Sequence, residues 1–264
     1  MSAIRMVVFD WAGTTVDYGS RAPLDVFREV FEEAGFSLAS EELAGPMGLE
    51  KKDHIRKLLE LEQVTAGWKE KYGALWNEQD VERLYERFEA RLKEVVASYS
   101  TPLPGVADTV ELLRRDGLRI GSTTGYTSKM MEEVLPQAAR GGYEPDCTVT
   151  PEQVGSGRPA PFMLLECMRR CNVYPPSAVV KVGDTVADME EGNNAGAWTV
   201  GVAEGSSLMG MTLEEYEGLT EEEKEAELER VVQLYDDAGA DYIIRSIREL
   251  PEAIAAINDE MAEE

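Results

Sequence analysis

The sequence predicts an α/β fold, a doubly wound parallel sheet into which an all-helical module is inserted after the first strand. Short apolar runs rich in β-branched residues alternate with helical segments over residues 101–264. One further run of this kind, 4–9, stands alone near the start. The intervening residues, 20–100, contain helical periodicity and no convincing strand. We therefore expect two domains, a core of residues 1–19 and 101–264 and a helical module of residues 20–100.

The core is expected to contain parallel strands joined by right-handed helical crossovers. A helix over 106–116 precedes the second strand, and another helix begins after Thr127. The heavily charged run 213–237 is expected to form a solvated surface helix. The strands are expected at 4–9, 118–122, 146–149, 178–182, 198–202 and 241–244.

The inserted module is expected to consist of four helices. The first covers 23–34, and the second is short and begins at Ser40, a favoured capping residue. A Gly-Pro break at 45–48 precedes the third, which covers about 50–61. The fourth and longest, 78–98, has a buried stripe at three- and four-residue intervals, formed by Val81, Leu84, Tyr85, Phe88, Leu92 and Val95.

The composition argues against partners that carry negative charge. The chain has 51 acidic and 26 basic residues, a formal charge of −25, which opposes binding to nucleic acid or to an anionic membrane. No apolar run is long enough to cross a bilayer, and the first strand begins too early to leave room for a signal peptide. We therefore expect a cytoplasmic protein. The three cysteines, Cys147, Cys167 and Cys171, are expected to be buried free thiols.

The turn after the first strand carries the most informative residues. Asp10 follows the strand, at the sheet edge where open α/β sheets bind their ligands, and a carboxylate there suits attack on phosphorus. Two residues later, where many phosphatases with this motif have a second aspartate, Ala12 offers no proton for an alkoxide leaving group. Either the leaving group is not an alkoxide, or another residue protonates it.

Polar side chains also follow later strands, and the carboxyl ends of parallel strands meet at one edge of the sheet. A guanidinium there suits phosphoryl oxygens, and carboxylates there suit Mg²⁺. Each of these residues alone could be ordinary loop polarity, but together they indicate a site. They are Thr124 with Gly125, Arg158 in a Gly-rich loop, and Asp184 with Asp188.

In this order along the chain, these residues resemble those of the haloacid dehalogenase superfamily, whose core is Rossmann-like. The resemblance implies that Asp10 is the nucleophile and that Thr124 and Arg158 hold the phosphoryl group. It also implies Mg²⁺ as cofactor. The metal-binding residues expected from it are Asp10, Ala12, Asp184 and Asp188.

The inserted module contributes a second motif, in the helix that follows the Gly-Pro break. Lys51 and His54, the only histidine, are three residues apart and share a helix face, whereas Lys52 points about 100° away. From these residues alone, a solvated helix end and a functional site are comparably good explanations.

With Ala12, this motif resembles the superfamily branch that hydrolyses the carbon–phosphorus bond of phosphonoacetaldehyde to acetaldehyde and phosphate. The resemblance implies that the module is a cap domain, that Lys51 forms a Schiff base with the aldehyde, and that His54 moves protons. Asp10 would take the phosphoryl group as an aspartyl phosphate, while carbon leaves as an enamine. Such a leaving group needs no acid at position 12, which would explain Ala12.

The resemblance also implies the surroundings of the reacting atoms and the assembly. Desolvation beneath the cap, together with the charges of Lys52 and Mg²⁺, is expected to lower the pKa of Lys51. A homodimer joined through the cap domains is expected, with a small-molecule phosphonate as substrate. The expected substrate-binding residues are Ala12, Met47, Gly48, Thr124, Gly125, Tyr126 and Arg158.

Other functions remain open. A dehalogenase that attacks carbon also lacks the second aspartate, but it needs no metal, so Asp184, Asp188 and Lys51 count against it. A phosphomonoesterase or mutase of the same fold is disfavoured by Ala12. A non-catalytic binding protein would not require a nucleophile, metal ligands and a phosphoryl-binding arginine all to be present.

Overall fold

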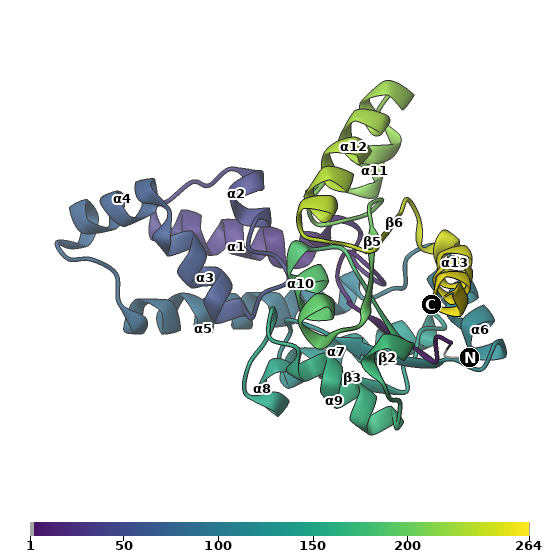
Figure 1. The fold of residues 1–264 in the computed structure, drawn as a ribbon. Helices are drawn as coiled ribbons and strands as arrows, with labels where there is room; N and C mark the ends of the chain where they lie inside the picture. The colour runs from purple at the N-terminus through teal and green to yellow at the C-terminus, as the bar shows by residue number, and fades with distance from the viewer. Residues whose placement is uncertain (1–2, 264) are drawn as a thin grey trace.

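The computed structural model describes residues 3–263 and contains a six-stranded parallel sheet of order β3-β2-β1-β4-β5-β6 (Figure 1). The first strand therefore lies inside the sheet, and the chain winds outward from it in both directions. This arrangement confirms the predicted doubly wound fold class. Each strand lies within its predicted range or extends one residue beyond it: β1 Met6–Phe9, β2 Arg119–Thr123, β3 Cys147–Val149, β4 Val179–Gly183, β5 Trp198–Val202 and β6 Tyr242–Ile244.

The sheet is covered on both faces, because alternate side chains of a strand point to opposite sides. In β1, Val7 and Phe9 belong to one hydrophobic cluster, and Met6 and Val8 belong to another. The second cluster includes apolar residues of α9, which packs on β2 and β3. The core helices are α6 Val106–Arg115, α7 Ser128–Arg140, α8 Pro151–Val154, α9 Phe162–Cys171, α10 Val186–Ala195, α11 Leu213–Glu217, α12 Glu221–Asp237 and α13 Leu250–Glu263.

The segment between β1 and α6 is helical and projects to one side of the sheet, as Figure 1 shows. We call residues 18–99 the helical unit. One of its helices, α4, was not predicted, because only Val64 and Trp68 give it a buried face. Its elements are η1 Tyr18–Ser20, α1 Arg21–Ala34, α2 Ser40–Ala44, α3 Lys51–Glu60, α4 Glu62–Tyr72, α5 Glu78–Val95 and η2 Val96–Tyr99.

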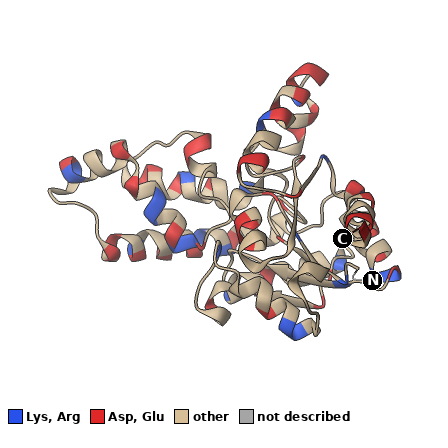
Figure 2. Ribbon diagram, viewed as in Figure 1, with Lys and Arg blue, Asp and Glu red and all other residues tan. Residues whose placement is uncertain are grey.

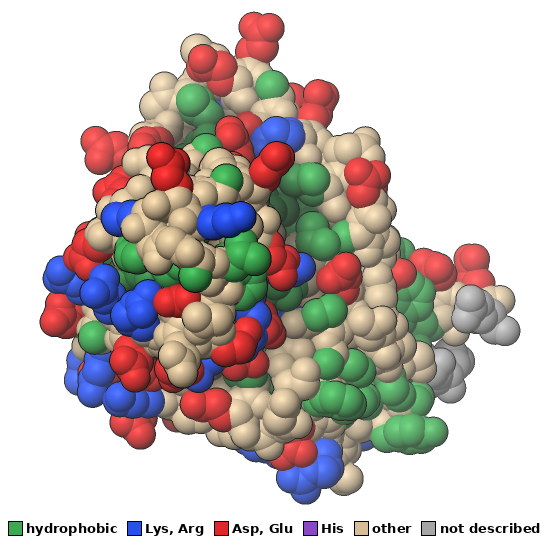
Figure 3. Space-filling view, turned by 90° about the vertical axis from the view of Figure 1, so that its left-hand side faces the viewer, with side chains coloured by type: hydrophobic (Ala, Val, Ile, Leu, Met, Phe, Trp, Pro, Cys, Tyr) green, Lys and Arg blue, Asp and Glu red, His purple; other side chains and the backbone are tan. Residues whose placement is uncertain are grey.

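The core of the helical unit lies between α1 and α5. The rings of Phe27 and Phe88 stack with their centroids 4.1 Å apart. The predicted stripe on α5 is buried at Val81, Leu84, Phe88 and Leu92, whereas Tyr85 and Val95 are only half-buried. Figure 3 views the outer end of this unit, where basic and acidic side chains interleave around a few apolar ones.

The prediction of one solvated helix over 213–237 was wrong in two respects. The chain breaks after α11, and Thr220 then caps α12 by accepting a hydrogen bond from the backbone N–H of Glu223. The inner face of α12 is also buried, at Leu228, Val231 and Tyr235. The acidic residues in its first turn are exposed, and they contribute to the predominance of red over blue in Figure 2.

All three cysteines are free thiols, as predicted, but only Cys167 is fully buried. Cys147 and Cys171 are partly exposed, and their sulfur atoms lie 3.4 Å apart. Among residues 3–263, no helix is both long enough and apolar enough to span a bilayer.

Candidate active site

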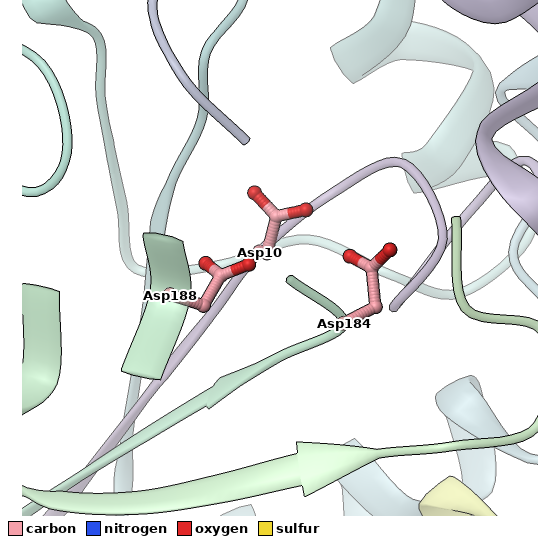
Figure 4. Close-up of side chains that lie close together, drawn as sticks. All are labelled: Asp10, Asp184 and Asp188. Carbon is pink, nitrogen blue, oxygen red and sulfur yellow. The ribbon is translucent and has the colours of Figure 1, made fainter. Parts of the chain in front are cut away.

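Three buried carboxylates, those of Asp10, Asp184 and Asp188, gather at the carboxyl edge of the sheet (Figure 4). Asp10 follows β1, Asp184 follows the neighbouring strand β4, and Asp188 lies in the first turn of α10. One oxygen atom from each lies within 4.8 Å of the others. Oxygen ligands at this spacing, shielded from water, fit a hard divalent cation. The structure thus brings together the three aspartates predicted to bind metal.

The loop after β1 positions Asp10 through its backbone. The Asp10 amide donates to the carbonyl of Val182 (2.9 Å), and the Thr15 hydroxyl donates to the carbonyl of Asp10 (3.0 Å). Gly13 has a φ of +90°, and a Cβ atom there would lie 2.2 Å from Oδ2 of Asp184. Glycine is therefore required for the loop to pass so close to the second carboxylate.

Asp10 and Asp184 are carboxylates whose charge is poorly compensated. Burial raises the pKa of Asp184 well above its usual range, and the negative charge of Asp10 raises it further. Burial also raises the pKa of Asp10, although Arg158 opposes the shift. Asp184 accepts hydrogen bonds from the Thr14 hydroxyl (2.9 Å) and the Ser207 hydroxyl (2.7 Å), which fix its orientation. A cation between these carboxylates would relieve their repulsion.

Asp188 differs from the other two carboxylates. Burial opposes its ionisation, but Arg158 and Lys181 outweigh burial and lower its pKa. Its Oδ1 lies 2.8 Å from Nζ of Lys181, and its Oδ2 accepts a hydrogen bond from the Thr185 hydroxyl (2.6 Å). Asp188 is therefore ionised and already paired with protein cations.

Arg158 links the loop that carries Asp10 to the helical unit. One of its terminal nitrogens, Nη2, donates to Oδ1 of Asp10 (2.6 Å), and the other, Nη1, lies 3.5 Å from the carbonyl of Gly48. Gly48 and Gly125 mark where the two parts meet. A Cβ on Gly48 would lie 2.3 Å from the Thr185 hydroxyl, and one on Gly125 would lie 2.7 Å from the carbonyl of Leu49.

A small, narrow pocket lies at this junction, with about 20 Å³ accessible to the centre of a water-sized sphere. This space is too small for an organic phosphonate, so entry of such a molecule requires the helical unit to move away. Every residue predicted to bind substrate lines the pocket. The lining residues are Asp10, Ala12, Ser20, Met47, Gly48, Lys51, Thr124, Gly125, Tyr126, Arg158 and Thr185.

Lys51 projects into the pocket from the first turn of α3 and is 4 % exposed. Its Nζ lies 5.4 Å from the centroid of the Tyr126 ring and 5.9 Å from that of Phe27. Burial lowers the pKa of Lys51 to about 8, and although Asp10 opposes this, the charge of Arg158 lowers it further. The supporting charge is thus Arg158, not Lys52 as predicted, because Lys52 pairs with Glu82 on the outer surface (2.6 Å).

His54 is fully buried behind Lys51 and does not line the pocket. Its Nε2 lies 3.0 Å from the carbonyl of Leu43, and its ring stacks on Phe27 with the centroids 3.9 Å apart. Burial lowers its pKa well below the usual value, and Lys51 lowers it further. The ring is therefore neutral, with the proton on Nε2, and Nδ1 has no hydrogen-bond partner among residues 3–263. A role in proton transfer remains a prediction.

Sequence reasoning missed two charged residues beneath the pocket, Lys181 and Glu191, and did not assign a role to Thr123. All three are completely buried and contact one another. The available signal was a lysine inside the apolar strand Val-Val-Lys-Val-Gly, since a lysine is rarely fully buried without a partner. Glu191 gave no such signal, because glutamate is common in helices.

The chain resembles known hydrolases over nearly its full length. A family model described as haloacid dehalogenase-like hydrolase matches residues 4–196, and a second, related hydrolase model matches 155–250. A phosphonoacetaldehyde hydrolase of Bacillus cytotoxicus is 47 % identical over 254 residues, covering 96 % of both chains. A bifunctional phosphonoacetaldehyde hydrolase/aminoethylphosphonate transaminase of Clostridioides difficile is also 47 % identical, but the match covers only 40 % of that longer protein.

The solved structures include one with almost the same backbone. A phosphonoacetaldehyde hydrolase-like protein from Oleispira antarctica superposes with a TM-score of 0.96 and is 35 % identical. The match covers 98 % of this chain and 94 % of that one, so the helical unit and the core are both included.

Proposed function

The chain belongs to the phosphonoacetaldehyde hydrolases, within the haloacid dehalogenase-like hydrolases, and we therefore propose that it hydrolyses phosphonoacetaldehyde to acetaldehyde and phosphate. One observation carries the proposal most directly. Lys51, whose pKa is about 8, lines the same pocket as Asp10, and the position two residues after Asp10 is an alanine. An amine that loses its proton readily and faces a carboxylate nucleophile suits an aldehyde that carries phosphorus.

The first step uses Lys51. Its free amine attacks the aldehyde carbon, water leaves, and a protonated Schiff base forms. The rings of Tyr126 and Phe27 border the amine and keep bulk water away from it. The neutral His54 behind Lys51 has an acceptor at Nδ1, so we propose that it receives and returns protons as the Schiff base forms and breaks down.

The second step breaks the carbon–phosphorus bond. Asp10 attacks phosphorus, and the electrons of the breaking bond move into the positively charged imine, which becomes an enamine. Arg158 and Thr124 line the pocket beside Asp10 and would hold the phosphoryl oxygens. Water then hydrolyses the aspartyl phosphate, while protonation of the enamine and hydrolysis of the resulting imine release acetaldehyde and regenerate Lys51. The carbon leaving group is an enamine whose electrons are delocalised, so it needs no proton from an acid at position 12, and Ala12 can stand there.

We propose Mg²⁺ as the resident ion, held by Asp10, Asp184, Asp188 and the loop at Ala12. When bound, the ion offsets the repulsion between the substrate's phosphoryl oxygens and the carboxylates. The chain's own residues position it: Gly13 lets the first loop approach Asp184, and Ser207 orients that carboxylate.

Addition of Mg²⁺ to chelator-treated protein should restore activity and raise the midpoint of thermal unfolding. Saturation at about 100 times the dissociation constant stabilises a folded protein by about 2.7 kcal/mol, because only the folded state has the site. We expect Asp184→Asn to lose both responses and Glu190→Gln, at an exposed position of α10, to keep both. An equal shift of the midpoint in Asp184→Asn would show that the ion binds elsewhere.

The reaction itself is tested by supplying phosphonoacetaldehyde and measuring acetaldehyde and phosphate in equal amounts. Borohydride added during turnover should reduce the Schiff base and leave a stable adduct on Lys51, which peptide mass spectrometry locates. Production of phosphate without any adduct on Lys51 would contradict the imine mechanism. Absence of both products would contradict the proposed substrate.

Location and assembly remain proposals of the same kind. We propose a cytoplasmic homodimer joined through the helical unit, which then acts as a cap over the pocket. Exposed apolar side chains at its outer end, Leu75 (60 % exposed) and Tyr72 (47 %), support a contact there. The bifunctional relative's name couples this hydrolysis to a transaminase, and oxidation of an amine to an aldehyde by transamination is the class of reaction that would supply the substrate.

A further inference from the structure

Four buried charges form a closed ring directly beneath the pocket. Arg158 contacts Asp188 (3.2 Å), Asp188 contacts Lys181 (2.8 Å), Lys181 contacts Glu191 (3.3 Å), and Glu191 contacts Arg158 again (3.0 Å). We call these residues the four-charge ring. All four side chains are inaccessible to solvent, and their charges sum to zero if all are ionised. A neutral ring with alternating signs is the arrangement that makes such complete burial tolerable.

The hydroxyl of Thr123 lies inside the ring and joins three of its members. It accepts hydrogen bonds from Nη2 of Arg158 (2.9 Å) and Nζ of Lys181 (2.9 Å), and it donates to Oε2 of Glu191 (3.0 Å). Thr123 ends β2, Lys181 lies in β4 and Glu191 in α10, so the ring joins elements that are distant in the sequence. The sheet and its covering helix thereby fix the position of every member except Arg158, which comes from a loop.

The ring decides which way the Arg158 guanidinium faces. Its Nε atom is bound to Glu191 on the side away from the pocket, while Nη2 reaches Oδ1 of Asp10 (2.6 Å). Without Glu191, nothing in the ring would hold Nε, and the guanidinium could rotate toward the carboxylates of Asp10 and Asp188. Without Lys181, Arg158 would be the only cation facing Asp188 and Glu191, and their combined attraction would draw it away from the nucleophile.

We propose that Lys181 and Glu191 are positioning residues for phosphoryl transfer, which hold Arg158 in register with Asp10 and the phosphoryl group. This inference rests on the proposed function, in which Arg158 binds the phosphoryl oxygens. The effect is indirect, because neither residue lines the pocket and both act through Arg158 and Thr123. Precise alignment of a bidentate donor with a charge that develops at phosphorus contributes to the rate more than to ground-state binding.

The main test is Glu191→Gln, which removes the charge and retains the shape. All contacts of Glu191 with the ring use Oε2, and Oε1 has no hydrogen-bond partner among residues 3–263, so an amide can occupy the same space. We expect kcat to fall about 10–100-fold, while KM rises by a smaller factor, about fivefold. Glu190→Gln is the matched control, since Glu190 precedes Glu191 on α10 but is exposed, and it should retain normal kcat.

A second variant guards against misfolding. Glu191→Gln combined with Lys181→Met removes one charge of each sign, so the net buried charge is unchanged and we expect the fold to be retained. This double variant should show the same loss of kcat or a larger one, with a cooperative unfolding transition. If kcat per folded molecule stays within about twofold of the wild-type value in either variant, the two residues are merely structural and the proposal is wrong.

Binding of inorganic phosphate separates this inference from the proposed function. Calorimetry with Mg²⁺ present measures phosphate affinity whether or not the protein cleaves phosphonoacetaldehyde. We expect Glu191→Gln to weaken phosphate binding at least about fivefold relative to Glu190→Gln, because the guanidinium is no longer fixed. Equal affinity in the two variants would overturn the positioning role even if the wild type proves active. If Glu191→Gln binds phosphate more weakly but the wild type does not cleave phosphonoacetaldehyde, the positioning role stands and only the proposed substrate is rejected.

Discussion

Replacement of Lys51 by methionine is expected to abolish phosphonoacetaldehyde hydrolysis, by about 10⁴-fold or more, while the protein becomes more stable. The loss follows because carbon cannot leave phosphorus without the imine. The gain follows from the lowered pKa: burial brings it from 10.5 to about 8, so protonating Lys51 at pH 7 costs the folded state up to about 3 kcal/mol. Methionine fills a similar volume and carries no charge.

Two measurements check this expectation, a product assay and urea unfolding at pH 7. Lys52→Met is the control, because Lys52 is the next residue, pairs with Glu82 on the outer surface and should be dispensable for activity. Substantial activity in Lys51→Met would reject the imine. A loss of stability in that variant would mean that burial does not disfavour the charged form of Lys51.

The pH dependence follows from the same group. Because the folded pKa of Lys51 is lowered, the amine is mostly protonated below about pH 8 and mostly free above it. We expect kcat, which reports the closed enzyme–substrate complex, to rise about tenfold per pH unit on the acid side and to level off near pH 8. The stability of the wild type relative to Lys51→Met should rise over pH 8 to 10.5, since the unfolded chain binds more protons there.

Replacement of Asp10 by asparagine should lower the rate of turnover about 10⁴-fold or more, as Lys51→Met does, but it should block a later step. An amide cannot serve as the nucleophile, so no aspartyl phosphate forms. Lys51 remains able to form the Schiff base, because loss of the negative charge that raises its pKa leaves the amine more readily free. Borohydride with phosphonoacetaldehyde should therefore still modify Lys51 in this variant.

Loss of turnover together with a retained borohydride adduct in Asp10→Asn would separate Schiff-base formation from attack on phosphorus. Asp108→Asn, at an exposed position in α6, serves as the control and should remain fully active. If Asp10→Asn retains activity, the nucleophile lies elsewhere. If it loses both activity and the borohydride adduct, Asp10 is needed for imine formation as well, and the division of labour proposed for Asp10 and Lys51 is wrong.

The sheet was predictable because its strands are short and contain β-branched residues, with several valines in β1, β4 and β5. The crossover rule predicted a doubly wound parallel sheet, but it did not predict the order of the strands within it. The helix α4 was missed because Val64 and Trp68 are its only buried residues, too few to produce a periodic pattern. The break before Thr220 was missed because the charged residues on either side are equally good helix formers.

The pocket residues could be named from strand ends and from one motif, but their electrostatics could not. Burial is the main cause of the lowered pKa of Lys51, and the charge of Arg158 adds to it. Burial depends on how the helical unit packs on the core. The position of His54 behind Lys51 depends on stacking against Phe27, which lies in α1, with α2 and two loops between them in the chain. Lys181 and Glu191 meet only because β4 and α10 pack together, which no local pattern reveals.

The narrow pocket, with about 20 Å³ accessible to the centre of a water-sized sphere, has a consequence for the times between turnovers. The low pKa of Lys51 depends on burial at the junction of the helical unit with the core. When the unit swings away to admit substrate, water reaches the amine and its pKa returns toward 10.5, so it becomes protonated. An open enzyme would therefore be inert toward sugars and other stray aldehydes, and the lysine would be reactive only around a molecule small enough to be enclosed.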